Sequence, residues 1–272
     1  MSCLLILTFV CFVGLLNPQK TVAQLLEPNC GITGIKDLIF GGTNAKHGEN
    51  PWMAYLYLNE NDFLCGGSLI HKRFALTAAH CIVNGQTLSV RLGEYYTESR
   101  AKSSIAYSVT LAIRNRLFSK HTYEHDIGIL KLDPEVQFNA NIRPICIFTD
   151  ASRAPFVTSY TVTGWGKTRE LWVADKLQTL ELEDISPASC YEHLGMHVKA
   201  GQICAGHPTG DTCLGDSGSP LGHLVNINGS MRYTQFGLVS YGRRVCRSPA
   251  VYTRVTYYAD WIVKVVKYGL SH

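Results

Sequence analysis

The chain has 272 residues, a formal net charge of +4 and only 17% charged residues. A chain of this length suits one large domain or two small ones, and β-barrel proteins of this size often count as one domain. The mild charge and the absence of a long Lys/Arg run exclude nucleic acid and an anionic membrane surface as expected partners.

The first 23 residues have the pattern of a secretion signal. Residues 4–16 are apolar, and Thr21-Val22-Ala23 offers a small-residue cleavage site before Gln24. The residues before Leu4 include no Lys or Arg, which departs from the usual signal. A membrane anchor is the alternative, but the apolar run is too short to span a bilayer. We therefore expect residues 1–23 to be a signal peptide and the protein to be secreted to the extracellular space.

The cysteine count agrees with secretion. Ten cysteines are present, and Cys3 and Cys11 fall within the signal peptide, which leaves eight. An even number in a secreted chain indicates disulfide bonds, but sequence spacing alone does not choose among the possible pairings. A zinc site is the alternative, and no C-x-x-C spacing supports it.

From residue 39 onward the pattern is that of β-structure. Short runs rich in aliphatic and aromatic residues, at 52–58, 87–92 and 127–132, are separated by turn signals such as Asn84-Gly85. Regularly spaced short strands predict an all-β barrel or sandwich. Near the C-terminus, Trp261, Ile262 and Val265 recur at helical spacing and predict a helix docked on the barrel.

Three separate motifs supply the groups that nucleophilic catalysis needs. Ser217 lies in D-T-C-L-G-D-S-G-S-P, His80 in L-T-A-A-H-C and Asp126 in H-D-I-G-I-L. A serine hydroxyl is a weak nucleophile and needs a base that a third group orients, so His80 is the candidate base and Asp126 the candidate orienting carboxylate. An α/β-hydrolase is excluded because its triad runs in the order Ser, acid, His.

These motifs, in this order, resemble those of the trypsin-like serine proteases of the chymotrypsin fold, the S1 family. The resemblance continues through segments that together cover residues 39 to about 268: I-F-G-G from Ile39, P-W from Pro51, C-G-G-S-L-I from Cys65, T-G-W-G-K-T from Thr163, S-Y-G from Ser240 and V-Y-T-R-V from Val251. It implies an all-β fold of two six-stranded antiparallel β-barrels with the active site between them and a C-terminal helix.

The resemblance also implies a disulfide pairing. The four expected bonds join Cys65 with Cys81, Cys190 with Cys204, Cys213 with Cys246 and Cys30 with Cys146. The first would hold the loop that carries His80, and the third would clamp the two walls of the specificity pocket. The last would keep residues 24–38, a short activation peptide, attached to the protease domain of residues 39–272 after cleavage.

The family mechanism assigns further roles at the site. His80 would take the proton of Ser217, and Asp126 would fix the imidazole tautomer. The backbone N–H groups of Gly215 and Ser217 would form the oxyanion hole. Asp211, six residues before the nucleophile, matches the pocket carboxylate that a substrate Arg or Lys would neutralise.

The remaining pocket residues are expected in two segments. Ser240 and Gly242 would pair with the substrate backbone, and Tyr241 would replace the usual tryptophan as an aromatic platform. Ala250 stands where trypsin-like members usually have glycine, so its methyl group would narrow the pocket. Ser219 replaces the second glycine of the family pattern G-D-S-G-G-P, and we expect it to perturb packing and not the oxyanion hole.

Activation in this family depends on a new N-terminus. Ile39 should provide it, inserting its ammonium beside Asp216 to form the oxyanion hole and pocket. Leu38 precedes the cut, so the activating protease should prefer leucine or large apolar residues and not Arg or Lys.

Two motifs suggest metals. His121-Thr122-Tyr123-Glu124-His125 matches the H-x-x-E-H zinc pattern, but that motif requires a helix and this run leads directly into the strand predicted at 127–132. Glu94 matches one position of the family's calcium-binding loop, although residues 95–102 are poor in carboxylates, which leaves calcium open but unsupported. We expect no metal and no cofactor.

Together these features predict a secreted serine endopeptidase, made as a zymogen, that cleaves after Arg or Lys. The expected partners are a protein substrate, an activating protease and protein protease inhibitors, and the protein should be a monomer. The alternative is a catalytically weak homologue that acts as a binding or regulatory partner in a protease cascade. Leu38, Ser219 and Ala250 favour the alternative, whereas the intact His80, Asp126 and Ser217 oppose it.

One modification site is also expected. Asn228-Gly229-Ser230 is the sole N-x-S/T sequon in the sequence, between the strand-like runs 221–227 and 231–239. A glycan on Asn228 would lie at a hairpin tip, and the alternative is that Asn-Gly simply forms the turn.

Overall fold

The structure is a computed structural model of the chain. It describes residues 25–33, 43–45, 48–58, 62–96, 104–166, 174–207, 217–242 and 248–272. The expected signal peptide, residues 1–23, lies outside these ranges. No helix within the described ranges is both long and apolar enough to cross a membrane.

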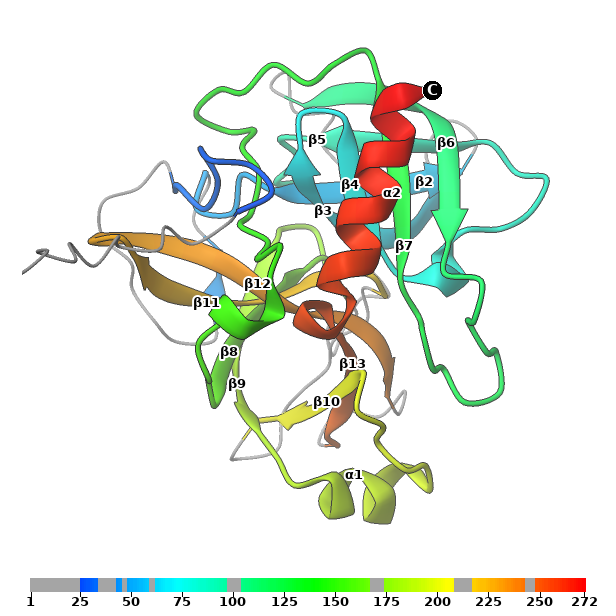
Figure 1. Cartoon of the computed structure of the whole chain (residues 1–272), viewed down its shortest axis with the longest axis vertical. Coiled ribbons are helices and arrows are strands. Elements are labelled where there is room, and N and C mark those ends of the chain that lie inside the picture. Colours follow the sequence, from blue (N-terminus) through cyan, green and yellow to red (C-terminus); the bar gives the residue numbers. More distant parts are fainter. Residues whose placement is uncertain are drawn as a thin grey trace, which may run out of the picture.

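The first barrel is a closed ring of six antiparallel strands in the order β2-β3-β4-β7-β6-β5 (Figure 1). Its strands are β2 (Met53–Leu58), β3 (Asp62–His71), β4 (Phe74–Thr77), β5 (Leu88–Leu92), β6 (Ile105–Arg114) and β7 (Gly128–Asp133). Strand β5 shows why the sequence forms a barrel wall, since Leu88, Val90 and Leu92 are buried in the barrel core while Ser89 and Arg91 between them are half-exposed.

The second barrel closes through the pairing of β8 with β9, and β1 adds to the edge of β9. The strand order is β1-β9-β10-β13-β12-β11-β8. Its strands are β1 (Thr43–Asn44), β8 (Ser159–Gly164), β9 (Gln178–Asp184), β10 (Gln202–Gly206), β11 (Pro220–Ile227), β12 (Ser230–Gly242) and β13 (Ala250–Arg254). The expected fold of two six-stranded antiparallel barrels is confirmed.

A separate apolar core joins the two barrels. Trp52, directly before β2, stacks on Tyr233 of β12 with ring centroids 4.9 Å apart, and Tyr55 of β2 meets Trp165 edge-on at 5.3 Å. These four rings belong to one buried cluster with residues from both barrels. Because the rings bury large areas, they fix the relative position of the two barrels.

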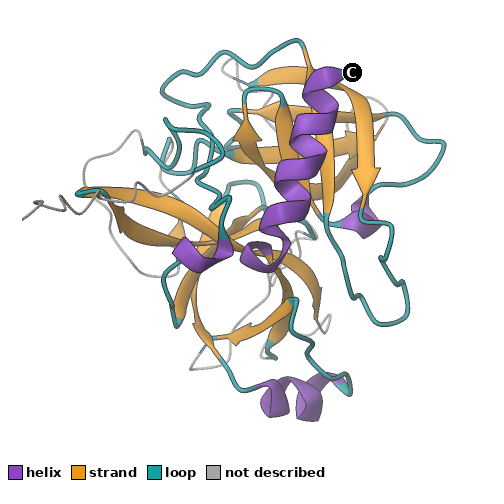
Figure 2. Ribbon diagram, viewed as in Figure 1, coloured by secondary structure: helices purple, strands orange, loops and turns teal. Residues whose placement is uncertain are grey.

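Helices lie outside the barrels (Figure 2). The predicted C-terminal helix is α2 (Ala259–Ser271), and it buries Ile262 and Val265. It begins at the second barrel, and its Gly269 packs against the Phe74 ring of β4, where a Cβ would approach to 2.7 Å. The helix therefore reaches across to the first barrel (Figure 1). Three short 3-10 helices occur in the described residues: η1 (Ala79–Cys81), η2 (Ala151–Arg153) and η3 (Val255–Tyr258).

Helix α1 (Pro187–Leu194) was not predicted. The Ser186 side chain caps its N-terminus by accepting the Ser189 N–H at 3.2 Å, and Gly195 ends it with φ 71°. A disulfide between Cys190 and Cys204 ties the helix to β10.

Residues 25–33 are held against the second barrel and against the segment around Cys146 that precedes it. Cys30 is bonded to Cys146, and the Tyr233 N–H donates to the Gly31 carbonyl at 3.0 Å. Gly31 has φ +68°, and a Cβ there would lie 2.6 Å from the Tyr233 carbonyl oxygen. Glycine is therefore required at this anchor for both its conformation and its size.

Candidate active site

His80 and Asp126, predicted as partners, are in direct contact. His80 lies in η1, directly after the fully buried strand β4. Its Nδ1 atom is 2.7 Å from Asp126 Oδ2, and its backbone N–H donates to Asp126 Oδ1 at 3.0 Å. The Asp126 side chain is 0% exposed and that of His80 is 25% exposed. One carboxylate therefore fixes both the backbone and the ring of a histidine that still reaches solvent.

The second barrel supplies two further donors to Asp126. Ser240 Oγ donates to Oδ2 at 2.6 Å, and Thr253 Oγ1 donates to the Asp126 backbone carbonyl at 2.8 Å. Ser240 thus satisfies an oxygen of a carboxylate that would be costly to bury without a partner, and Thr253 holds the backbone of the same residue. With Nδ1–H directed at the carboxylate, the Nε2 atom of His80 is left as the proton acceptor.

Ser240 reaches Asp126 because of a bulge in β12. Val239 pairs with Tyr252 and Tyr241 pairs with Val251, so Ser240 is an extra residue on its strand. A bulge of this kind redirects one side chain out of the regular alternation. Ser240 was expected to pair with the substrate through its backbone, and its side-chain contact with Asp126 was not predicted.

Ser217 is held to both barrels by its backbone. Its carbonyl accepts the N–H of Gly66 in β3 at 3.0 Å, and the next N–H, of Gly218, donates to the Val239 carbonyl at 2.8 Å. The Ser217 carbonyl oxygen also lies 3.6 Å from the Cys81 sulfur, next to His80. The serine motif of the second barrel is thus brought to the His80 element of the first.

Gly218 makes this approach possible. It has φ +84°, and a Cβ would lie 2.3 Å from Thr77 Oγ1 and 2.5 Å from the Gly66 carbonyl oxygen. No side chain fits in that space, so the chain after Ser217 packs directly on β3 and β4.

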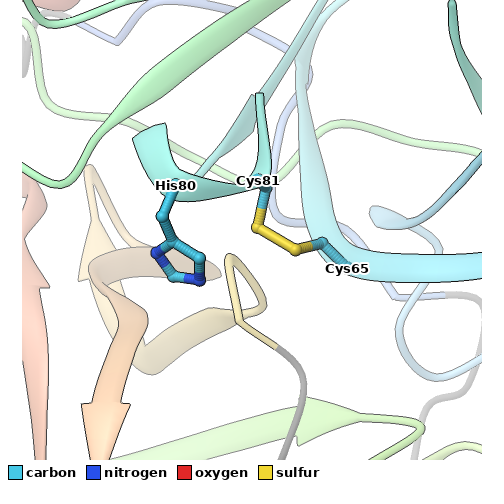
Figure 3. A group of neighbouring side chains, drawn as sticks. All are labelled: Cys65, His80 and Cys81. Carbon is cyan, nitrogen blue, oxygen red and sulfur yellow. A yellow bond between two sulfur atoms is a disulfide. The ribbon is translucent and has the colours of Figure 1, made fainter. Parts of the chain in front are cut away.

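The disulfide beside His80 also excludes a metal reading. Cys65, His80 and Cys81 bring their potential ligand atoms within 4.8 Å of one another. The two sulfurs are bonded to each other at 2.03 Å, so neither is a thiolate that could bind a metal (Figure 3). His80 Nδ1 already contacts Asp126. This group therefore braces the His80 turn.

The two other metal candidates are placed as follows. Residues 121–125 form turns that lead into β7, not the helix that an H-x-x-E-H zinc site requires. Glu94 has a side chain only 1% exposed, 3.6 Å from Arg91. Burial raises the pKa of Glu94, while a hydrogen bond with Ser104 and the charge of Arg91 oppose that rise. Among the described residues Glu94 belongs to no group of three metal-ligating side chains.

Four expected pocket residues lie on the neighbouring strands β12 and β13: Ser240, Tyr241, Gly242 and Ala250. Gly242 of β12 pairs with Ala250 of β13, and a Cβ on Gly242 would lie 3.0 Å from the Ala250 Cβ. The Ala250 methyl group therefore occupies the space beside Gly242. Tyr241 lies 5.1 Å from the ring of Tyr123, and burial raises the pKa of its hydroxyl.

Several expected residues fall outside the described ranges. They are Leu38, Ile39, Asp211, Gly215 and Asp216, together with the expected bond between Cys213 and Cys246. The other three expected disulfides are formed in the structure: Cys30–Cys146, Cys65–Cys81 and Cys190–Cys204.

Ser219 is fully buried. Its carbonyl accepts the Val239 N–H at 2.9 Å, whereas its hydroxyl has no hydrogen-bond partner among the described residues. A buried hydroxyl without a partner costs stability. The backbone hydrogen bond of Ser219 does not need the serine side chain, so the hydroxyl contributes only its cost.

Further residues that were not predicted from the sequence surround His80 and Asp126. Tyr123 sets its ring perpendicular to that of His80, with centroids 5.8 Å apart. Gln202 and Tyr258 bond to the turn before Asp126. Burial, the largest cause, raises the pKa of Tyr258 to about 12, so its hydroxyl remains protonated. These contacts join residues more than forty positions apart, so no local pattern signals them.

Comparisons with known proteins agree with this geometry. The Trypsin family model matches residues 39–262. The CLIP domain-containing serine protease B15 of Anopheles gambiae is 34% identical over 268 residues, which cover 88% of this chain and 72% of that protein. The clotting factor G beta subunit of Tachypleus tridentatus is 33% identical over 263 residues, which cover 88% of this chain and 83% of that subunit.

A solved structure gives the same result. The crystal structure of the Drosophila Grass clip serine protease of the Toll pathway superposes with a TM-score of 0.74 at 28% identity, covering 88% of this chain and 75% of that one. Two antiparallel barrels, a contact between His80 and Asp126, and a family match over residues 39–262 lead to one conclusion. The chain belongs to the trypsin-like serine proteases of the chymotrypsin fold.

Proposed function

We propose that this protein is a secreted serine endopeptidase that uses Ser217, His80 and Asp126 to cleave protein substrates after Arg or Lys. The observation that carries the proposal is the buried Asp126 carboxylate, which holds His80 Nδ1 at 2.7 Å, while the Ser217 carbonyl, bonded to the Gly66 N–H, lies 3.6 Å from the sulfur of the adjacent Cys81. This arrangement leaves Nε2 of His80 as a base in a site where a serine has been brought close.

The reaction proceeds by acyl transfer. Ser217 Oγ attacks the scissile carbonyl carbon while His80 Nε2 takes the hydroxyl proton. The C–N bond then breaks and His80 gives that proton to the departing amine. Water attacks the acyl-enzyme, His80 takes its proton, and the proton returns to Ser217 as the ester bond breaks. Asp126 stabilises the imidazolium at each stage, and the N–H groups of Gly215 and Ser217 stabilise the oxyanion.

The specificity proposal rests on the sequence position of Asp211 and on the wall formed by Gly242 and Ala250. A buried carboxylate in the pocket favours a substrate cation, because an unpaired charge there is costly. The Ala250 methyl group beside Gly242 leaves a narrower pocket than glycine would.

Activation is proposed to follow cleavage before Ile39, with Asp216 receiving the new ammonium group. The Cys30–Cys146 bond and the Gly31 contacts support retention of residues 24–38 as the activation peptide. A cut after Leu38 calls for an activating protease with an apolar preference. N-terminal sequencing of active material should read Ile39 first, and any other start would contradict this step.

The proposed partners follow from the relatives. One relative is named as a clotting factor subunit and one structure as a protease of the Toll pathway. These names support a protein substrate and an activating protease as partners of this chain, and we propose in addition that it is a monomer that protein inhibitors stop. The competing candidate is a catalytically weak homologue, which the Ala250 methyl group and the Ser219 hydroxyl, without a partner among the described residues, favour.

A glycan on Asn228 is proposed as well. Ile227 pairs with Ser230, so Asn228 and Gly229 form a two-residue hairpin turn, with φ +53° and +85°. Asn228 is exposed, and no atom would lie within 4 Å of a Cβ at Gly229. Glycosidase treatment should lower the mass of the secreted protein but not of an Asn228→Gln variant. An Asn226→Gln variant, outside any sequon, should keep the mass shift.

Labelling decides between enzyme and inactive homologue. An active-site-directed phosphonate should label the protein cleaved before Ile39, and Ser217→Ala should abolish the label. Ser230→Ala provides a serine control far from the site and should label as wild type does. Profiling on a mixed peptide library should then show cleavage after Arg and Lys. A folded, correctly cleaved wild type that stays unlabelled would establish the inactive homologue.

A further inference from the structure

The turn before Asp126 has a backbone that is costly to maintain. Tyr123 has φ +51° and His125 has φ +56°, although neither is glycine. Left-handed backbone is uncommon for large side chains and persists only when surrounding contacts enforce it. Contacts within the turn include the Tyr123 N–H to the Ser119 carbonyl, at 2.8 Å.

The second barrel enforces the turn at both ends. Gln202 Nε2 donates to the Tyr123 carbonyl at 3.1 Å, and Thr253 Oγ1 donates to the Asp126 carbonyl at 2.8 Å. Gln202 and Thr253 are directly opposite each other on β10 and β13. One cross-strand pair therefore holds the first and last residues of a turn that belongs to the other barrel.

Gln202 is fixed in one orientation. It is 3% exposed, and its Oε1 atom accepts the Lys199 N–H at 2.9 Å. The amide nitrogen must therefore face Tyr123, where a carbonyl accepts it. The Gln202 backbone is fixed too, because its carbonyl accepts from Arg254 Nη2 at 3.0 Å. Both ends of the side chain are used, so no other rotation of the amide satisfies these groups.

Tyr123 transmits this constraint to the base. Its ring lies edge-on to the His80 ring at 5.8 Å and packs against Tyr241 at 5.1 Å. A shift of Tyr123 would release the contact with the imidazole and open the aromatic wall beside it. It would also loosen the turn that presents the Asp126 carboxylate.

We propose that Gln202 is a positioning residue: its amide N–H holds Tyr123, and through Tyr123 it sets the His80 ring and the wall that the substrate meets. This inference rests on the proposed protease function. It assigns to a buried polar side chain outside the three proposed catalytic residues a share of the catalytic rate and not only of stability.

An isosteric substitution tests the amide N–H directly. Gln202→Glu keeps an acceptor for the Lys199 N–H but replaces the donor to Tyr123. As an anion it repels the Tyr123 carbonyl, whereas the protonated acid donates to it. We expect kcat/KM per labelled site to fall about 10-fold near pH 8, because one hydrogen bond to a buried carbonyl contributes on that order. The ratio to wild type should rise toward one as the pH falls to about 6, because burial favours the protonated acid.

The groups around this position that carry or titrate charge are Lys199, Arg254, Glu124, His125 and Tyr258. All of these groups, and His80, are unchanged in both Gln202 variants, so the uncharged Gln202→Met variant serves as the control for any pH effect that does not come from the introduced carboxyl group. Gln202→Met, which neither donates nor titrates, should lose a similar factor at every pH and should therefore give a flat ratio.

Gln235→Glu is the matched control. Gln235 is 1% exposed, accepts from Ser68 Oγ at 2.7 Å and donates to the Gly237 carbonyl at 3.0 Å, but it does not contact the turn. Its variant should melt at a lower temperature while kcat/KM per labelled site stays unchanged. Counting sites with the phosphonate separates the two proposals, since an unlabelled wild type ends the protease function itself.

The inference is confirmed if Gln202→Glu shows the pH-dependent ratio and Gln202→Met the flat loss. It is overturned if Gln202→Met remains within twofold of wild type per labelled site. A flat ratio for Gln202→Glu, or the same pH dependence in Gln235→Glu, would overturn it equally.

Discussion

The two halves of the site are stabilised by different means. The His80 half depends on side chains, since Asp126 receives hydrogen bonds from His80, Ser240 and Thr253. The Ser217 half depends on backbone bonds and on the space left by Gly218. The comparison teaches that loss of a polar group should damage the first half, and that an added carbon atom should damage the second.

The largest effect is expected from the first half. Asp126→Asn keeps the shape of the side chain but presents an amide where His80 Nδ1–H needs an acceptor. The imidazole should adopt the wrong tautomer, and kcat should fall by about 10⁴. Steady-state kinetics on a peptide substrate would measure this loss.

Asp150→Asn is the control for that change. Asp150 caps η2 through Ser152, away from His80, and should leave kcat unchanged. A fall of less than tenfold in the Asp126 variant would show that the carboxylate does not set the base.

The second half should break when a methyl group is added. Gly218→Ala would place a Cβ 2.3 Å from Thr77 Oγ1 at a residue with φ +84°. We expect a loss of unfolding free energy on the order of 3 kcal/mol, from overpacking and backbone strain together. Chemical denaturation would measure it.

Gly229→Ala separates the two causes of that loss. Gly229 has φ +85°, but no atom would lie within 4 Å of its Cβ. Only the backbone term remains, so the loss should be about 1 kcal/mol. Equal losses at the two glycines would contradict the close approach described for Gly218.

The smallest effect is expected from a side chain in the Ser217 half, which is otherwise held by backbone hydrogen bonds. Ser219→Ala removes a buried hydroxyl that has no partner among the described residues. We expect a gain in unfolding free energy of about 1 kcal/mol. Ser68→Ala should have the opposite sign, since the buried Ser68 hydroxyl donates to Gln235 at 2.7 Å. Melting temperatures of the two variants that shift in the same direction would contradict this reading.

Local sequence patterns predicted an all-β barrel or sandwich, and the family resemblance predicted the two six-stranded barrels. Short aliphatic and aromatic runs between turn residues predicted several strands, and helical spacing predicted α2. The order of the motifs predicted that His80 and Asp126 are partners, and the structure shows them in contact. Helix α1 could have been recognised from Ser186, Pro187 and Gly195, which mark its two ends.

The rest depended on contacts between distant strands. The side chain of Ser240 meets Asp126 only because β12 gains a residue against β13, and register of this kind is set by the whole sheet. Gln202 resembles any polar residue at the start of a strand until Tyr123 is placed beside it. Buried polar partners are specified by three-dimensional packing, so a single sequence does not reveal them.

The anchor at Cys30 and Gly31 has a consequence for how activation would be observed. A peptide-bond cut between residues 33 and 43 would convert one chain into two that remain joined by the Cys30–Cys146 bond. On a gel without reductant the zymogen and its product would migrate alike, and a smaller heavy chain would appear only after reduction. Since Gly31 also pairs with the Tyr233 backbone, the light chain would remain on the same surface after the cut. A binding partner that distinguishes the two forms must therefore recognise another part of the molecule.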